Sequence, residues 1–386
     1  MNVYEATQAR LRYCFQEFER VVVYFSGGKD STVLLHMAQD IQTEFPDKEL
    51  VVVFIDWEVQ YSYTMRFVES MMSQVKQAMW FCVPLVTVNA TSVFQPEWTC
   101  WDPECKDCWV REMPSQAITQ LPDFQFPMTF EEFVPRLNHY LSSGQKTICL
   151  SGIRSEESLN HYRTMVSEKK HRYAGHHWTT QYEDSTVHGY PLIEWKVSDV
   201  WVYLTSFHKP YNPIYDLMYM AGVAPGQMRV CEPFGNEQKE GLWLYHIIEP
   251  ETWSKMLNRV SGVNFGALYA RGRGSVLGKQ MPTLPEGVTW RGFVEGLLET
   301  LPQNTARHYR AKIGVYMGWC AKHQVDVPDA VDGDCGGKDV PSWRRVARAI
   351  LRNDYWCVSL SFSPTKTAHY ERYLSQVERL GVSYGK

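Results

Sequence analysis

The sequence has no long hydrophobic run, little excess charge and few cysteines for its length. Its longest aliphatic runs, Val21 to Phe25 and Leu50 to Ile55, are far shorter than the roughly 20 apolar residues that cross a bilayer. The start, Met-Asn-Val-Tyr-Glu, lacks the basic and apolar segments of a secretory signal. Ten cysteines among 386 residues are too dilute for a disulfide scaffold. We therefore predict a cytoplasmic protein with no membrane partner, whose cysteines are free thiols or metal ligands.

The charge balance excludes a protein that binds nucleic acid with its whole surface. The 39 basic and 43 acidic side chains give a net charge of -4. The 44% of hydrophobic residues suffices for a sizeable core, and the length favours about two to three domains of roughly 150 residues. Residues 301–386 contain 13 Lys or Arg and 8 Asp or Glu, so only this part attracts anions.

Hydrophobic periodicity predicts alternating helices and strands in the first part of the chain. We expect helices over residues 5–19, 32–44, 62–80, 130–141 and 198–207, and strands over 21–25, 50–55, 81–88, 147–150 and 190–193. This order is typical of a parallel sheet covered by helices. The sequence thus predicts an α/β fold, with a parallel sheet sandwiched by helices, in a domain over residues 1–225. Residues 90–128 are expected to form an inserted loop, and residues 226–386 a mainly helical second domain.

The strongest chemical signal is a Gly-Gly loop between the first predicted strand and the next helix. It consists of Ser26, Gly27, Gly28, Lys29, Asp30 and Ser31. Paired glycines allow a tight turn, so that backbone N–H groups and a helix N-terminus can face phosphate oxygens. The loop is not a Walker A motif, because Val23 stands where its first glycine belongs and Asp30 follows Lys29. An ordinary strand-to-helix turn remains the alternative.

This loop resembles the pyrophosphate-binding loop of the N-type ATP pyrophosphatases, also called adenine nucleotide alpha hydrolases. The resemblance implies cleavage of ATP between its α and β phosphates, commonly to adenylate a substrate. Further blocks resemble the phosphoadenosine phosphosulfate reductase family: Gly152-Ile153-Arg154, Pro191 to Trp195, Asp199 to Trp201, and Asn212 to Tyr215. Together they cover residues 20–222.

The C-terminal part resembles an extension found in some reductase-like proteins. The segments that carry this likeness are Met228 to Gly235 and Pro341 to Arg345. That subfamily includes regulators of immunoglobulin-binding surface proteins and is often encoded beside a ParB-like protein. The resemblance therefore implies a ParB-like partner, but it says little about the substrate.

The family resemblance implies roles for individual residues. Ser26, Gly27, Gly28, Lys29 and Ser31 are expected to hold the β and γ phosphates, and Asp30 to bind Mg²⁺ or to fix the loop. Asp56 ends the second predicted strand and is expected to hold ribose, adenine or the metal, with a helix N-cap as the alternative. Gly152 is expected to allow close approach of the nucleotide. Arg154 is expected to bind an anionic group, with a surface ion pair as the alternative. We assign catalysis to Lys29, Asp30 and Arg154.

The sequence leaves the reaction open between three hypotheses. The first is adenylation of an unidentified acceptor, in nucleic-acid or sulfur metabolism. The second is sulfonucleotide reduction, which in the family uses a late Glu-Cys-Gly-x-His motif; here Cys335 keeps only Cys-Gly. The third is a non-enzymatic nucleotide-sensing regulator that acts with a ParB-like or nucleic-acid partner.

Two further clusters could bind a metal or a nucleic acid. Cys100, Cys105 and Cys108 include a Cys-x2-Cys pair, which can chelate zinc or an iron–sulfur cluster if a fourth ligand joins them. The alternative is that they pack in a Trp-rich loop. A second cluster consists of Arg344, Arg345, Arg348 and Arg352, which the spacing places along one helical face that could follow a phosphate backbone. The alternative is a solvated face paired with acidic residues.

Overall fold

The computed structural model describes residues 2–156, 171–181, 186–235, 238–264, 281–334, 340–355 and 357–360. The chain forms two compact units. The first collects Met1–Thr87, Thr99–Pro233 and Leu244–Met256, and the second Val88–Trp98, Phe234–Trp243 and Leu257–Lys386. Each unit consists of several separate stretches of the chain, whereas the predicted domains 1–225 and 226–386 are continuous. The two predicted domains therefore stay a prediction.

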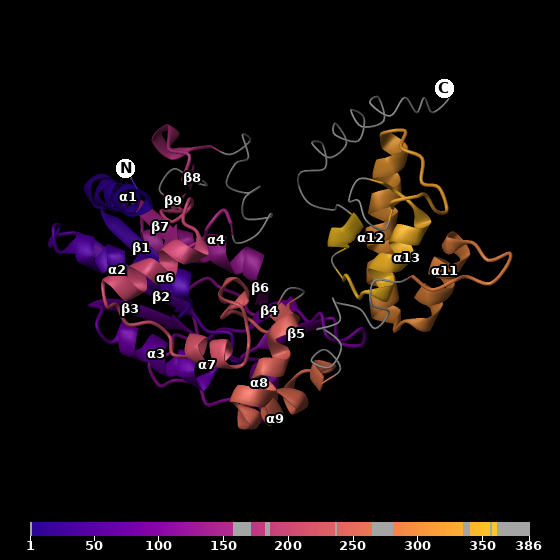
Figure 1. Ribbon diagram of the computed structural model, residues 1–386, viewed down its shortest axis with the longest axis horizontal. Helices are drawn as coiled ribbons and strands as arrows, with labels where there is room; N and C mark the ends of the chain where they lie inside the picture. The colour runs from indigo at the N-terminus through magenta and orange to yellow at the C-terminus, as the bar shows by residue number, and fades with distance from the viewer. Residues whose placement is uncertain are drawn as a thin grey trace. The chain divides into compact units, whose positions relative to one another are not determined.

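The first unit is built on a six-stranded sheet with the order β3-β2-β1-β7-β9-β8 (Figure 1). The strands are β1 (Arg20–Tyr24), β2 (Glu49–Ile55), β3 (Gln77–Phe81), β7 (Thr147–Ser151), β8 (Thr179–Gln181) and β9 (Thr186–Gly189). All neighbours are parallel except β8, which pairs antiparallel with β9. β1 and β2 are runs of buried aliphatic residues because helices cover both faces of the sheet. The expected α/β fold is confirmed.

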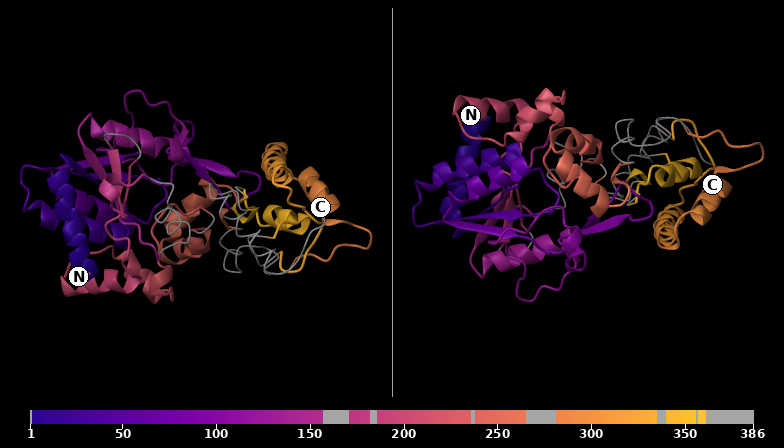
Figure 2. Two further views of the ribbon diagram at one scale, coloured as in Figure 1. Left: turned by 90° about the horizontal axis from the view of Figure 1, so that it is seen from above. Right: turned by 90° about the horizontal axis from the view of Figure 1, so that it is seen from below.

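Helices connect and cover the strands. They are α1 (Val3–Glu17), α2 (Lys29–Gln42), α3 (Ser62–Met72), α4 (Phe130–Ser142), α6 (Val197–Ser206) and α7 (Ile214–Met220). α1 and α2 lie on one face of the sheet and α4 on the other (Figure 2). α8 (Leu242–Ile248) and α9 (Pro250–Arg259) follow. Among the described residues, no helix combines the length and apolar character needed to cross a membrane.

Three sequence-based boundaries were wrong. The helix expected over 62–80 ends at Met72, and its last residues form β3 instead. The strand expected over 81–88 is divided at Pro84, which lacks the N–H for a ladder bond: β4 (Leu85–Val88) belongs to a separate three-stranded sheet. The strand expected over 190–193 is a turn, and β9 ends just before it at Gly189.

The inserted segment, expected to be a loop, contains short regular elements. β5 (Glu97–Cys100) and β6 (Met128–Thr129) flank β4 in the three-stranded sheet, and a 3-10 helix spans Pro103–Cys108. The segment is therefore an ordered excursion between β3 and α4.

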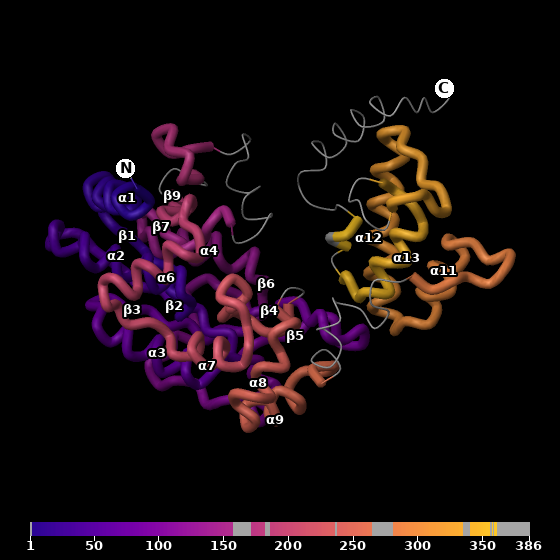
Figure 3. The backbone as a smooth tube through the Cα atoms, in the orientation of Figure 1, coloured from indigo at the N-terminus to yellow at the C-terminus, as the bar shows by residue number. Residues whose placement is uncertain are grey.

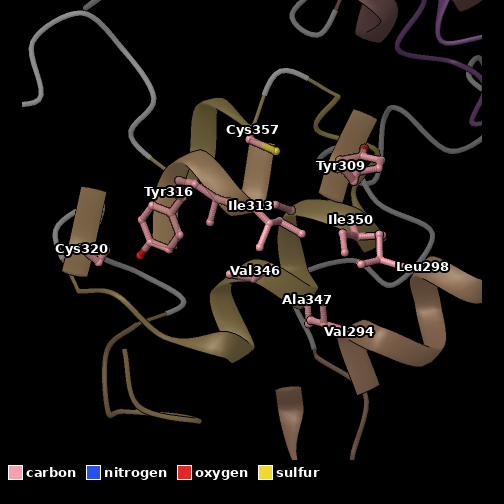
Figure 4. Close-up of a cluster of buried hydrophobic side chains, with 12 residues drawn as sticks. Val294, Leu298, Tyr309, Ile313, Tyr316, Cys320, Val346, Ala347, Ile350 and Cys357 are labelled. Atoms are coloured by element: carbon pink, nitrogen blue, oxygen red, sulfur yellow. The ribbon is translucent and has the colours of Figure 1, made fainter. Parts of the chain in front are cut away.

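The second unit has a helical core of its own. Its main helices are α11 (Trp290–Thr300), α12 (Gln303–Lys322) and α13 (Trp343–Leu351), which follow one another in the backbone trace (Figure 3). Val294 of α11, Tyr309 and Ile313 of α12, and Val346 and Ile350 of α13 are buried in one cluster (Figure 4). This confirms the expected helical character of the C-terminal part.

Candidate nucleotide site

The order of the strands identifies one position at the carboxyl edge of the sheet as a candidate ligand site. From β1 the chain moves outward through β2 to β3, and then returns to β7 on the other side of β1. Ligands of open α/β sheets bind at such a switch point, beyond the carboxyl ends of the strands. The loops that follow β1 and β7 are Ser26–Ser31 and residues 152–154, and both were predicted to form the site.

The Gly-Gly loop turns sharply between β1 and α2. Gly27 has a φ of +71°, and a Cβ atom there would lie 2.7 Å from Cγ2 of Val68, so this position requires glycine. The hydroxyls of Ser26 and Ser31 lie 3.0 Å apart, and the N–H of Gly28 points toward Oγ of Ser26 at 3.3 Å. The loop therefore gathers hydroxyls, amides and the positive end of a helix, as phosphate binding requires.

Lys29 is the first residue of α2, and its side chain is buried. Its ammonium lies 3.0 Å from the carboxylate of Asp30 and 3.3 Å from the carbonyl oxygen of Met228. Its backbone N–H donates to the hydroxyl of Tyr215 at 2.8 Å. Tyr215 of α7 and Met228, both of which follow the last strand of the sheet in the sequence, thus form one wall of the loop.

The β7 loop packs directly on the start of α2. A Cβ on Gly152 would lie 2.9 Å from the backbone nitrogen of Ser31 and 2.9 Å from the carbonyl carbon of Asp30. Residue 152 must therefore be glycine, because the neighbouring backbone of α2 leaves no room for a Cβ atom. The guanidinium of Arg154 is also buried, and its Nε donates to Asp30 at 2.5 Å. Arg154 is not the surface ion pair considered as an alternative.

Asp56 directly follows the carboxyl end of β2, the strand that pairs with β1, and is completely buried. Its carboxylate accepts hydrogen bonds from the indole of Trp80 at 2.8 Å and the N–H of Glu58 at 2.9 Å, and pairs with Arg111. It is not a helix N-cap, since α3 begins at Ser62. In this structure Asp56 orients protein groups, and its contact with a nucleotide stays a prediction.

Arg111 and Glu58 are site residues that were not predicted from the sequence. Glu58 is buried with a φ of +66°, and its carboxylate accepts the N–H groups of Trp101 and Val110 at 2.8 and 3.1 Å. Arg111 lies over the ring of Trp101, 4.9 Å from its centroid. These contacts attach the inserted segment to the carboxyl edge of the sheet. A single arginine or glutamate in an irregular segment carries no sequence signal for such a role.

The carboxylates considered as magnesium ligands do not fit that role in this structure. Asp30 is paired with Lys29 and Arg154, and Asp56 with Arg111. Each carboxylate is neutralised by a cation that a metal ion would have to displace.

The three clustered cysteines do not form the metal site considered from their spacing. Cys100 is buried, its Sγ donates to the carbonyl of Val83 at 3.6 Å, and burial raises the pKa of its thiol, which opposes the thiolate that zinc or iron needs. Cys105 is half-buried and Cys108 is exposed. Within the described ranges no three His, Cys, Asp or Glu side chains are grouped so that they could hold a metal.

The four arginines expected along one face of α13 do not share a free surface. Arg345 is buried and donates to the carbonyl of Ser359 at 2.8 and 2.5 Å. Arg344 binds Asp334 through two nitrogens, with a shortest distance of 2.6 Å. Arg348 and Arg352 are half-buried. The prediction of one phosphate-binding stripe is therefore wrong for its first two members.

Comparison with known proteins decides the family. Residues 20–221 match the phosphoadenosine phosphosulfate reductase domain, and residues 222–325 match a domain of unknown function (DUF3440). The chain belongs to the phosphoadenosine phosphosulfate reductase domain family. This confirms the resemblance drawn from the Gly-Gly loop and the later blocks, and the second match agrees with the expected C-terminal extension.

Two relatives and one solved structure are examples of what the chain is similar to. The chain is 42% identical over 395 residues to the uncharacterized protein YbdN of Escherichia coli (strain K12), covering 100% of this chain and 96% of that protein. It is 23% identical over 244 residues to an adenosine 5'-phosphosulfate reductase of Bacillus cereus (strain 03BB102), covering 60% and 83%. The crystal structure of the Candida glabrata FMN adenylyltransferase in complex with FAD and inorganic pyrophosphate aligns with a TM-score of 0.34 at 15% identity, covering 55% and 58%.

Proposed function

We propose that this protein binds ATP with its β and γ phosphates on Ser26–Ser31 and cleaves the α–β bond to adenylate an acceptor. The observation that carries the proposal is the geometry at the switch point. There the Gly-Gly loop, the N-terminus of α2 and Arg154 of the β7 loop meet around Asp30. Membership of a family named for a sulfated adenine nucleotide supports nucleotide binding.

The proposed reaction is a displacement at the α phosphorus. A nucleophilic oxygen of the acceptor forms a bond to this phosphorus, the bond from the α phosphorus to the bridging oxygen breaks, and the electron pair leaves with pyrophosphate. Donors of the loop stabilise the negative charge that develops on the leaving group. Lys29 and Arg154 both contact Asp30, and Arg154 also lies 3.4 Å from Glu156, so the charges of these four side chains balance. The N–H groups of the loop and the N-terminus of α2 are the groups that favour phosphates there.

Sulfonucleotide reduction is the second candidate, favoured by the reductases among the relatives. It needs a reactive thiolate at the nucleotide. Burial raises the pKa of the thiols of Cys14, Cys82 and Cys149, which keeps them protonated. Cys335, the residue singled out from the sequence, lies outside the described residues. Because the sequence lacks the late Glu-Cys-Gly-x-His motif of the reductases, we propose adenylation as the reaction and expect no thioredoxin-dependent release of sulfite from phosphoadenosine phosphosulfate.

Turnover of ATP distinguishes the proposed enzyme from the third hypothesis, a regulator that uses ATP only as a ligand. The ParB-like and nucleic-acid partners stay predictions.

The proposal is tested by ATP binding and by the products. Calorimetry should show that Lys29→Ala weakens ATP affinity at least tenfold, while Lys76→Ala, at an exposed position distant in sequence from the loop, leaves it unchanged. With candidate acceptors, nucleotide chromatography should show AMP-containing product and pyrophosphate. Equal ATP affinity in wild type and Lys29→Ala would reject the site, and ADP with phosphate would reject the reaction.

A further inference from the structure

We propose that Asn212 is a positioning residue that orients the peptide between Gly27 and Gly28, and so directs the N–H of Gly28 toward the phosphates. This inference rests on the proposed function, because it concerns the same loop. It assigns a role to a residue that lies 185 positions away from Gly27 in the sequence.

The side-chain amide of Asn212 is fully buried and held at both ends. Its Nδ2 donates to the carbonyl oxygen of Gly27 at 3.0 Å and to Oγ1 of Thr64 at 2.9 Å. Its Oδ1 accepts the N–H of Ile214 at 3.1 Å, at the start of α7. α7 lies beside α3, which carries Thr64 (Figure 1). The amide therefore has one orientation, with its donor toward the loop.

Because the peptide bond is planar, the hydrogen bond to the carbonyl of Gly27 also fixes the direction of the N–H of Gly28. In a trans peptide the C=O and the N–H point to opposite sides. Since the carbonyl of Gly27 points to Asn212, the N–H of Gly28 points away, toward the hydroxyl of Ser26 at 3.3 Å. That hydroxyl lies 3.0 Å from the hydroxyl of Ser31, which donates to the carbonyl oxygen of Gly28 at 3.0 Å, so the N–H of Gly28 and the two hydroxyls lie together on one side of the loop.

Two glycines in succession make this anchor necessary. A Gly-Gly peptide can flip with little steric cost because neither residue has a Cβ. In the flipped form the carbonyl oxygen of Gly27 would face the phosphates and repel them. The buried donor of Asn212 favours the orientation that presents an N–H, and the contact does not involve the nucleotide itself.

The test compares ATP with AMP, because only ATP carries the phosphates that this peptide would contact. Asn212→Leu keeps the number and branching of the side-chain heavy atoms and removes both the donor to Gly27 and the acceptor of the Ile214 N–H. We expect it to weaken ATP affinity about tenfold or more in calorimetry, while AMP affinity changes less than twofold. Asn212→Ala carries the same expectation if the leucine variant does not fold. A general loss of structure would weaken both nucleotides equally.

Two control variants separate this role from ordinary packing. Thr64→Val removes the other acceptor of Asn212 and leaves the bond to Gly27, so ATP affinity should stay within twofold of wild type. Asn138→Leu removes a buried asparagine on α4 that bonds to Tyr24 of β1 and His188 of β9 and should also leave ATP affinity unchanged.

The outcomes distinguish this inference from the proposed function. Unchanged ATP affinity in a folded Asn212 variant, or equal weakening of ATP and AMP, overturns the inference while Lys29-dependent binding of ATP persists. If wild type shows no Lys29-dependent ATP binding, the proposed function fails and this inference fails with it.

Discussion

Replacing Gly152 by alanine tests how closely the β7 loop packs on α2. The added Cβ would lie 2.9 Å from the carbonyl carbon of Asp30 and 3.0 Å from its carbonyl oxygen. These atoms belong to the first turn of α2 and cannot rotate away as a side chain does. Either α2 or the β7 loop must shift, which also disturbs the ion pair between Asp30 and Arg154.

The expected cost follows from the nature of the contact. Overpacking in a well-packed region costs about 1–3 kcal/mol, and a clash with backbone belongs to the upper part of that range. Gly226→Ala is a matched control in the same unit, because a Cβ at this position meets no atom within 4 Å. Such an open position should change the free energy of unfolding by no more than about 0.5 kcal/mol.

Urea unfolding, followed by tryptophan fluorescence, measures both variants against wild type. Gly152→Ala should lower the urea midpoint of unfolding without changing the denaturant slope. Gly226→Ala should leave both the midpoint and the slope unchanged. Calorimetry should also show weaker ATP binding in Gly152→Ala, since the start of α2 is displaced. Equal midpoints for the two variants would refute the packing argument.

Other features of the structure give three shorter predictions. Burial lowers the pKa of His36 below its ordinary 6.5, so the unfolded chain takes up the proton first as the pH falls. The stability that neutral His36 contributes above pH 6.5 is therefore lost below that pH. The thermal midpoints at high and low pH should differ less in His36→Gln than in wild type. Arg344→Ala removes the guanidinium that binds buried Asp334 and should cost about 1.5–3 kcal/mol in urea unfolding, against about 0.5 kcal/mol or less for Arg348→Ala. A thiol reagent should modify exposed Cys108 in the native protein much faster than buried Cys100, and a similar rate for both would contradict the structure.

The sequence alone was sufficient to predict the central strands β1 and β2 and the Gly-Gly loop. β1 and β2 are continuous aliphatic runs bounded by polar residues, and this pattern has few alternatives in a parallel sheet. The Gly-Gly loop is local, so its six residues identify it without any knowledge of the fold. The end of α3 was missed because residues 73–80 contain apolar positions that suit either a helix or the strand β3.

The partners of the site residues depend on contacts that are distant in sequence. Asp56 is paired with Arg111, 55 residues later, and Lys29 touches the carbonyl of Met228, 199 residues later. The spacing of Arg344 and Arg345 indicated a helix correctly, but their acceptors come from other segments of the same unit. Periodicity identifies the face of a helix and leaves open what covers it.

The central claim is that Ser26–Ser31 holds the phosphates of ATP. A crystal structure of the full chain with α,β-methylene-ATP tests this directly. We expect β or γ phosphate oxygens within about 2.7–3.2 Å of the backbone nitrogen of Gly28 and the hydroxyl of Ser31. Phosphates bound elsewhere, with the loop making no contact to the nucleotide, would contradict the account.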